Sequence, residues 1–309
     1  MRSARYEEVL RRAPRHELAR GDSGFPAGLR DLEGKVGRIY VVGDPGALSG
    51  DCLSVIGARR ATPYGLACAR MAGRVAAECG VTVVSGGACG CDQEAGRAAL
   101  EAHGRTVVIP GCAADVVYPS SSAGLFADAV ERGGCVVSLE RWGSEPRKYM
   151  FVRRNDAIAA LSQALLVCEA GRPSGTFGTA TTAAELGRRV YAVPGSIFSP
   201  NSRGTNWLIE SGAAIVTDER ALEGLVALDY GRLRMVSPEP PETRGRLMDA
   251  LVASPMLPDE LARHLGLDVP STLALLTELE LVGSVSRLAD GRFTPSQELL
   301  VGHNAVSGR

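Results

Sequence analysis

The residues best suited to binding chemistry lie in a glycine-rich turn at residues 81–92. Four β-forming residues lead into Ser85, and Gly86, Gly87 and Gly90 follow before a helical pattern begins. A strand that breaks into glycines and re-enters a helix presents free backbone N–H groups and a positive dipole end, which together bind anions such as phosphate. The same pattern is also typical of an ordinary tight turn in an α/β sheet, so this turn alone leaves both interpretations open.

Similar turns recur along the chain beside arginines. A buried strand at residues 53–57 is followed by Arg59, and Ser174, Gly175 and Thr176 precede another helical segment. Arginine can bind a phosphate through two parallel hydrogen bonds. Several anion-binding turns on one side of a sheet favour a polyanion or a nucleotide as the ligand.

A basic and aromatic segment precedes the fifth predicted strand. It contains Arg147, Lys148, Phe151, Arg153, Arg154 and Asn155. Basic residues interleaved with aromatic ones are typical of proteins that bind single-stranded nucleic acid, because the cations contact the backbone and the rings stack on bases. The alternative is a solvated helix start with Phe151 in the core.

The same loops contain little that could catalyse a reaction. All four histidines lie outside them, so no Ser-His-Asp arrangement is predicted. Glu169 is the single acid in the loop after the fifth strand, and one carboxylate makes a poor acid/base pair. Cys89 and Cys91 have no second cysteine or histidine pair at ligand spacing, so we expect no zinc site and no other cofactor.

The elements that position these loops alternate regularly between strand and helix. This alternation predicts an α/β fold, an extended Rossmann-like, doubly wound and mostly parallel sheet whose ligands lie outside the carboxyl ends of its strands. Residues 36–42 are expected to form an edge strand, and Asp92 is expected to cap the helix that follows it. The predicted parallel strands are residues 53–57, 81–85, 105–109, 135–139, 164–168 and 190–193.

The C-terminal part of the chain reads as a separate domain. Prolines at residues 237–241 indicate a stiff linker, and three short helices followed by a hairpin are typical of a winged helix. Residues 240–300 hold five arginines against nine acids, which suits duplex DNA poorly and favours contacts with protein. The predicted divisions are residues 1–24 (an N-terminal extension), 25–230 (the Rossmann-like domain), 231–242 (the linker), 243–298 (the winged helix) and 299–309 (a tail).

Composition sets limits on the location and the partners. The chain has 309 residues and a formal net charge of −1, which excludes a uniformly basic nucleic-acid coat but leaves room for a local basic patch. There is no apolar run of transmembrane length and no signal peptide pattern. Most of the eight cysteines lie in apolar patterns, as expected of buried thiols in a reducing cytosol. The predicted location is the cytoplasm.

A series of short motifs runs along most of the chain. It includes Gly24-Phe25-Pro26, Val55-Ile56-Gly57-Ala58-Arg59, Thr62-Pro63-Tyr64-Gly65, Val83-Val84-Ser85-Gly86-Gly87-Ala88, Val117-Tyr118-Pro119, Phe151-Val152-Arg153-Arg154-Asn155, Ser174-Gly175-Thr176 and Val193-Pro194-Gly195-Ser196. In these motifs the chain resembles the DprA/Smf family of DNA-processing proteins. The resemblance spans roughly residues 25–218, and the winged-helix pattern is also similar to that of the family.

The resemblance implies a function. Proteins of this family bind single-stranded DNA without sequence preference, protect incoming strands in natural transformation, act as dimers, help to load the RecA recombinase and are not known as enzymes. It also implies a DNA pocket at Arg59, Ser85, Gly86, Gly87, Phe151, Arg153, Arg154, Asn155, Ser174, Gly175 and Thr176.

Some positions depart from the family pattern. Cys89 and Asp156 stand where the family often has basic residues, which should weaken phosphate binding unless Arg147, Lys148 and Arg172 compensate. An alternative resemblance, to nucleoside monophosphate phosphoribohydrolases related to lysine-decarboxylase-like proteins, comes from residues 174–179. In those enzymes an acid follows the loop threonine by three residues, whereas this chain has Thr182 there. The missing carboxylate argues against hydrolysis.

Overall fold

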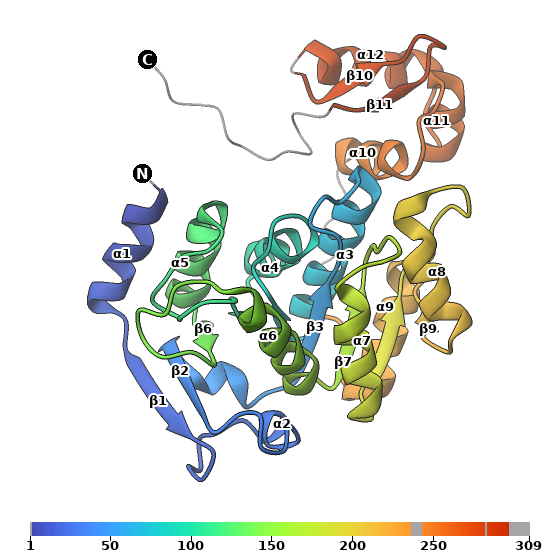
Figure 1. Ribbon diagram of the computed structural model, residues 1–309. Coiled ribbons are helices and arrows are strands. Elements are labelled where there is room, and N and C mark those ends of the chain that lie inside the picture. The colour runs from blue at the N-terminus through green and yellow to red at the C-terminus, as the bar shows by residue number, and fades with distance from the viewer. Residues whose placement is uncertain (1, 236–242, 282, 297–309) are drawn as a thin grey trace. The chain divides into compact units, whose positions relative to one another are not determined.

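The computed structural model describes residues 2–235, 243–281 and 283–296 (Figure 1). The chain divides into two compact units, Met1–Met235 and Val236–Arg309. The predicted linker segment at residues 237–241 and the predicted tail at residues 299–309 lie outside the described residues. Among the residues described, no helix is both long enough and apolar enough to cross a lipid bilayer.

The first unit is built on a single nine-stranded sheet in the order β1-β2-β6-β5-β4-β3-β7-β8-β9. Neighbouring strands from β6 to β9 pair in parallel, whereas β1 and β2 pair antiparallel, which confirms the predicted doubly wound α/β fold. The strands are β1 (Arg15–Ala19), β2 (Arg38–Gly43), β3 (Cys52–Ile56), β4 (Thr82–Ser85), β5 (Thr106–Val108), β6 (Cys135–Ser138), β7 (Ala164–Val167), β8 (Arg189–Ala192) and β9 (Ala214–Ile215).

One strand was missed by the sequence reasoning. The segment at residues 36–42 was expected at the sheet edge, but β1 pairs along the outer side of β2 and takes that position. The sequence of β1 is Arg-His-Glu-Leu-Ala, and none of its residues is fully buried, so it carries no apolar signal. Pairing with β2 and the 2.8 Å ion pair between Glu17 and Arg38 hold it in place.

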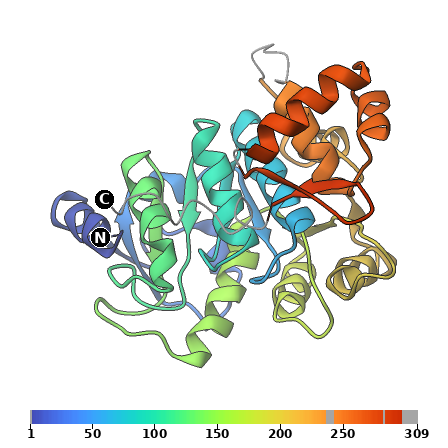
Figure 2. The ribbon, with the colours of Figure 1, turned by 90° about the horizontal axis from the view of Figure 1, so that it is seen from above.

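Helices cover both faces of the sheet. One face carries α2, α6, α7 and α8, and the other carries α1, α3, α4, α5 and α9; Figure 2 shows α6 and α7 opposite α3, α4 and α5. Successive strand residues serve opposite cores, as Val107 and Val108 do, because side chains alternate along a strand. The helices are α1 (Arg2–Arg12), α2 (Ala27–Arg30), α3 (Pro63–Glu78), α4 (Cys91–Glu101), α5 (Ala123–Glu131), α6 (Lys148–Leu161), α7 (Thr176–Glu185), α8 (Arg203–Glu210) and α9 (Glu219–Tyr230), with 3₁₀ turns at Pro45–Leu48, Ser120–Ser122 and Pro200–Ser202.

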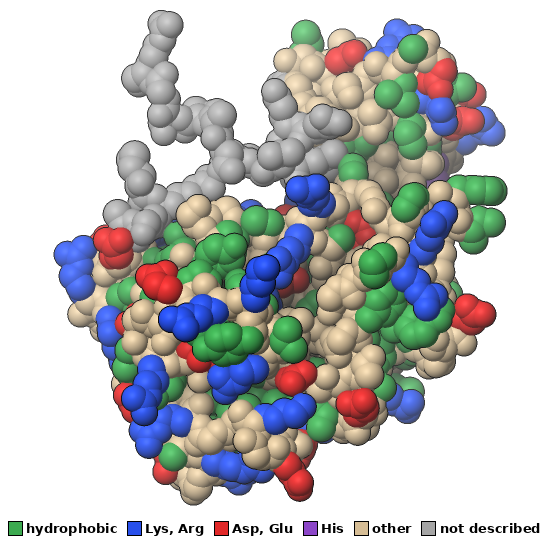
Figure 3. Space-filling model, viewed as in Figure 1, with side chains coloured by type: hydrophobic (Ala, Val, Ile, Leu, Met, Phe, Trp, Pro, Cys, Tyr) green, Lys and Arg blue, Asp and Glu red, His purple; other side chains and the backbone are tan. Residues whose placement is uncertain are grey.

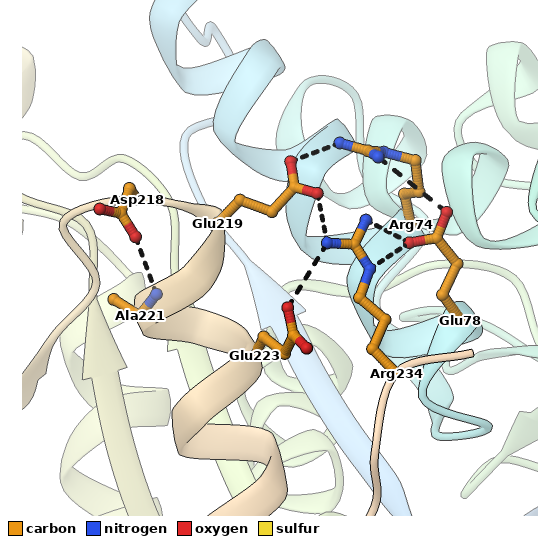
Figure 4. A network of polar contacts seen from close by, with 7 residues as sticks. All are labelled: Arg74, Glu78, Asp218, Glu219, Ala221, Glu223 and Arg234. Atoms are coloured by element: carbon orange, nitrogen blue, oxygen red, sulfur yellow. Dashed lines mark hydrogen bonds and ion pairs between the residues drawn. The ribbon is translucent and has the colours of Figure 1, made fainter. Parts of the chain in front are cut away.

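An ion network holds the last residues of this unit (Figure 4). The guanidinium of Arg234, only 10% exposed, contacts Glu78 of α3 and Glu219 of α9 at 2.5 Å each. Arg74 contacts Glu219 at 2.6 Å, and the amide of Met235 donates to the carbonyl of Glu78. Residues 231–235, assigned to the linker from sequence, are therefore tied to the first unit.

The second unit contains three helices and a hairpin, as predicted. They are α10 (Thr243–Ala253), α11 (Pro258–Leu265), α12 (Val269–Leu281), β10 (Val285–Arg287) and β11 (Phe293–Pro295). Its small core joins Leu247, Leu251, Leu261, Leu276 and Phe293. Helix, helix, helix and antiparallel hairpin in this order form a winged helix, and the family comparison below supports that description.

Candidate nucleic-acid interface

The candidate site lies at the carboxyl edge of the parallel strands. The strand order reverses between β3 and β7, and ligands of doubly wound sheets bind at such a switch point. Crossover helices run antiparallel to the strands they connect, so α3, α4, α6 and α7 all begin at this edge. Their N-terminal N–H groups and positive dipole ends make the edge attractive to anions.

The glycine turn after β4 is shaped to fit an arginine. A Cβ atom on Gly86 would lie 1.2 Å from Nη1 of Arg154, so the guanidinium rests against the bare backbone of the turn. Gly87 and Gly90 adopt φ values of +64° and +84°, which side chains rarely tolerate. Gly90 also precedes α4 as its N-cap residue, and a Cβ there would lie 2.2 Å from the carbonyl oxygen of Ala58. Each glycine of the predicted turn is thus required by the local geometry.

Arg154 forms a buried pair with Asp92. Their side chains are 5% and 7% exposed, and Nη1 of Arg154 lies 3.7 Å from Oδ2 of Asp92. Burial raises the pKa of Asp92 and lowers the pKa of Arg154, because each charged form loses hydration. Nε of Arg154 has no hydrogen-bond partner within the residues that the structure describes. The buried guanidinium therefore has unused donor capacity.

The position of Asp92 corrects a sequence expectation. It was expected to cap α4, but Gly90 is the N-cap residue and forms no side-chain capping bond. The Asp92 carboxylate instead accepts a 3.4 Å hydrogen bond from the amide of Ala88 and faces Arg154. The reason is that α4 begins before Asp92, so its side chain turns back into the glycine turn.

An aromatic ring joins the two arginines of the site. The guanidinium carbons of Arg59 and Arg154 lie 5.6 Å and 5.9 Å from the ring centre of Phe151. The ring packs on Gly111, where a Cβ would approach within 2.4 Å, and meets Tyr118 edge-on at 5.7 Å. Phe151 is only half-buried and Tyr118 is 46% exposed. Partial burial fits both sequence interpretations of Phe151, as a core residue or as a stacking platform, so both stay predictions.

Ser85 occupies a different environment from these residues. Its side chain is fully buried, and its hydroxyl donates a 2.8 Å hydrogen bond to the carbonyl of Val55 in β3. The Ser85 side chain thus joins β3 to β4 below the turn rather than facing outward. What Ser85 can offer a ligand is its backbone position at the start of the glycine turn.

The loop after β7 is tied to α3 and to itself. Glu169, 3% exposed, accepts a 2.8 Å hydrogen bond from the amide of Thr62, the N-cap residue of α3. The hydroxyl of Ser174 accepts a hydrogen bond from the amide of Thr176. Gly175 lies between them and is exposed. Glu169 therefore connects the two loops that flank the switch point. This structural role was not predicted from the sequence, which was searched for acid/base and binding residues.

The remaining predicted residues lie on α6. Arg153 forms a 2.7 Å ion pair with Glu140, so its charge is already partly neutralised. Arg147 and Lys148 are exposed at the helix start, and Asn155 is half-buried. Basic side chains gather over the part of the molecular face that α6 and its neighbouring loops form (Figure 3).

Asp156, which departs from the family pattern, has local partners. Its carboxylate lies 3.4 Å from Nζ of Lys35 and accepts a 3.0 Å hydrogen bond from the hydroxyl of Thr182 in α7. The acid therefore connects α6 to α7 on the helical layer, and its charge is partly matched by Lys35.

Together these contacts bring four of the predicted residues into one cluster. Arg59, Gly86, Phe151 and Arg154 meet at the switch point, whereas Arg147 and Arg153 lie further along α6 and residues 174–176 form their own loop. Tyr118 and Asp92 join the cluster and were not predicted as site residues. The only signal for Tyr118 was its place in a motif of the resemblance.

Guanidinium groups, a half-buried ring and a glycine turn at the switch point of a doubly wound sheet are features typical of α/β proteins that bind phosphate-bearing ligands. The model of the DNA recombination-mediator protein A family matches residues 16–225, and that of the DprA winged helix domain matches residues 234–291. The chain belongs to the DNA recombination-mediator protein A family, which confirms the resemblance seen in the sequence.

Individual relatives agree with this assignment. Protein Smf of Escherichia coli (strain K12) is 35% identical over 288 residues, covering 90% of this chain and 77% of that protein. The X-ray structure of DNA processing protein A from Streptococcus pneumoniae aligns with a TM-score of 0.63 at 30% identity, covering 70% of this chain and 75% of the other. A structure of DNA processing protein A from Helicobacter pylori, described for its single-stranded DNA binding mode, has a TM-score of 0.63 at 26% identity and covers 71% and 98%.

Proposed function

We propose that this protein binds single-stranded DNA without sequence preference through the rim site, defined here as Arg59, Gly86, Phe151 and Arg154. The observation that carries the proposal is the pair of guanidinium groups within 6 Å of the centre of the Phe151 ring, one of which rests against a glycine turn. Cations bind the phosphates while an accessible ring stacks on bases, and stacking is available only to bases that are not paired. The similar protein from Helicobacter pylori, described for its single-stranded DNA binding mode, supports this choice of ligand.

The wider role follows from the family. We infer that the protein protects incoming single strands and helps to load RecA recombinase during transformation and recombination, acting as a homodimer and without catalysing a reaction. The winged helix would then contact protein rather than DNA, because its segment carries five arginines against nine acids. Ser174, Gly175, Thr176, Asn155 and Lys148 would add contacts along the strand.

Nucleotide hydrolysis is the less favoured alternative. The position of the hydrolase carboxylate is occupied by Thr182, whose hydroxyl is engaged by Asp156. Glu169 is buried and engaged with Thr62. Release of free base from a nucleoside monophosphate by the purified protein would support the alternative and count against a purely binding role.

Cys89 offers a direct test of where the strand lies. It is the one exposed thiol among the eight cysteines, and it stands inside the glycine turn between Ala88 and Gly90. We expect a single-stranded oligonucleotide to slow maleimide labelling of Cys89 at least tenfold at saturation, and a duplex of the same length to slow it less. Labelling at the same rate with and without a saturating single strand would place the strand elsewhere.

Arg59→Ala tests the energetic contribution of the rim. Losing one charged contact should weaken single-strand affinity about tenfold and lower the slope of log affinity against log salt by about 0.7. Fluorescence anisotropy over a salt titration measures both quantities. Arg220→Ala is a matched control, because Arg220 is an exposed arginine on α9, a helix that lines no part of the rim site. Equal affinities and slopes for the Arg59 variant and the unmodified protein would contradict the proposal.

A further inference from the structure

A hollow lies beside the rim site, at the ends of β2 and β6. Its volume is about 800 Å³, within the range of pockets that bind small ligands. We call it the β6–α6 hollow, because the loop between β6 and α6 forms much of its wall. The residues that matter here are Arg38, Tyr40, Arg141, Arg147, Tyr149 and Arg153.

The charge of the hollow is positive and only partly neutralised. Its wall contains four arginines and two glutamates, Glu140 and Glu145. Glu140 pairs with Arg153, and Arg38 pairs with Glu17 outside the hollow. In contrast, the exposed Arg141 and Arg147 form no ion pair with any residue in the described ranges. At least these two guanidinium groups are available to an anion.

One tyrosine of the hollow can stack on a ligand. Tyr149 is 51% exposed, at the first turn of α6. Tyr40 is 7% exposed and already packs edge-on against Trp142 at 5.3 Å. Tyr149 is therefore the accessible ring, and with Arg141 and Arg147 it combines cations with a stacking platform, as single-strand binding proteins do.

The hollow is continuous with the rim site through α6. Met150 and Arg153 line the hollow, while Arg154 of the same helical turns reaches the glycine turn and Phe151 lies beside it on Gly111. Arg147, which lines the hollow, is the N-cap residue of α6, and its side chain makes no capping bond to the first N–H groups of the helix. A chain that crosses the start of α6 would meet both sets of residues.

We propose that the β6–α6 hollow is a second contact site for the same single-stranded DNA, holding nucleotides beyond those at Phe151. This proposal rests on the function proposed above. The Phe151 ring packs on Gly111 just beyond β5, and two strand spacings of about 4.8 Å separate β5 from β2, or about 10 Å, which corresponds to roughly three stacked nucleotides. A strand of two nucleotides can occupy one site only, whereas a strand of twenty can occupy both.

The test compares these two lengths. Oligothymidylates of two and twenty nucleotides carry a fluorophore, and anisotropy measures their affinities for the full chain. The double variant Arg141→Ala/Tyr149→Ala should bind the twenty-nucleotide strand at least tenfold more weakly, since loss of stacking alone is worth about fivefold or more. Its affinity for the two-nucleotide strand should stay within about twofold of the original. Both side chains are exposed, and thermal unfolding checks that the variant folds.

Arg59→Ala and Arg220→Ala complete the design. Arg59→Ala should weaken both lengths, and Arg220→Ala neither. An equal loss for both lengths in the double variant, or no loss for the long strand, would overturn the second site. If Arg59→Ala left both lengths unaffected while the double variant weakened the long strand, the proposed rim site would fail and the hollow would be the main contact.

Discussion

Gly86→Ala is expected to lower single-strand affinity at least tenfold. The new Cβ would lie 1.2 Å from Nη1 of Arg154 and 2.8 Å from Oδ2 of Asp92. Because Nη1 is the end of a long side chain, the clash is relieved by moving Arg154 away from the turn. This movement separates the guanidinium from Asp92 and from Phe151, so the variant loses one of the two cations of the rim. Overpacking of this kind also costs about 1–3 kcal/mol of folding free energy.

Anisotropy and denaturant unfolding measure the two effects separately. The matched control is Gly124→Ala on α5, where a Cβ would meet no described atom within 4 Å. Alanine is the better helix former, so this control should keep its affinity and gain up to about 1 kcal/mol of stability. A Gly86 variant that binds as tightly as the original would show that DNA binding does not require the position of Arg154 against the glycine turn.

Much of the fold could be predicted because its elements follow simple periodicities. The apolar runs at β3, β4, β6 and β7 are buried on both faces, as parallel strands must be, and they stand out from the sequence. Thr62 caps α3 as expected, because a threonine followed by proline begins a helix. The strand β1 escaped prediction because its stability comes from pairing with β2, which no local pattern records.

The site could be predicted only where a loop contains a recognisable sequence pattern. Strand ends rich in glycine placed Gly86 and Arg59 at the correct edge, because parallel strands share one carboxyl edge. The pairing of Asp92 with Arg154 could not be seen, since the two residues are 62 positions apart and meet only when α6 packs on the sheet. The local sequence predicts that Asp92 caps the helix, which is the commonest role of an aspartate at a helix start. In the folded chain, tertiary packing pairs Asp92 with the buried Arg154 instead.

The electrostatic design of the rim follows from this pair. The chain as a whole is nearly neutral, so DNA affinity depends on where cations are concentrated. Asp92 partly offsets the charge of Arg154 and makes a buried guanidinium tolerable, while the buried Nε has no hydrogen-bond partner among the described residues. Exposed Arg59 needs no such support. Burial therefore holds Arg154 in place before DNA binds, whereas the exposed Arg59 side chain can change its conformation on binding.

Asp92→Ala is expected to lower the free energy of unfolding by about 3–5 kcal/mol, because it leaves the buried Arg154 charge uncompensated. Urea unfolding followed by tryptophan fluorescence reports on the first unit, since Trp142 and Trp207 both lie there. The matched control is Asp128→Ala, which breaks the exposed 2.6 Å pair with Arg5 and should cost no more than about 1 kcal/mol.

A double variant separates the ion pair from simple loss of packing. Asp92→Ala/Arg154→Met removes both charges and keeps a long apolar side chain in the cavity, so it should be more stable than Asp92→Ala alone. It should nevertheless bind single strands weakly, because the buried cation is gone. Asp92→Ala, in contrast, keeps the cation and should bind at least as tightly per folded molecule. If the double variant were no more stable than Asp92→Ala, the loss of unfolding free energy would come from the turn geometry around Ala88 rather than from the unpaired charge.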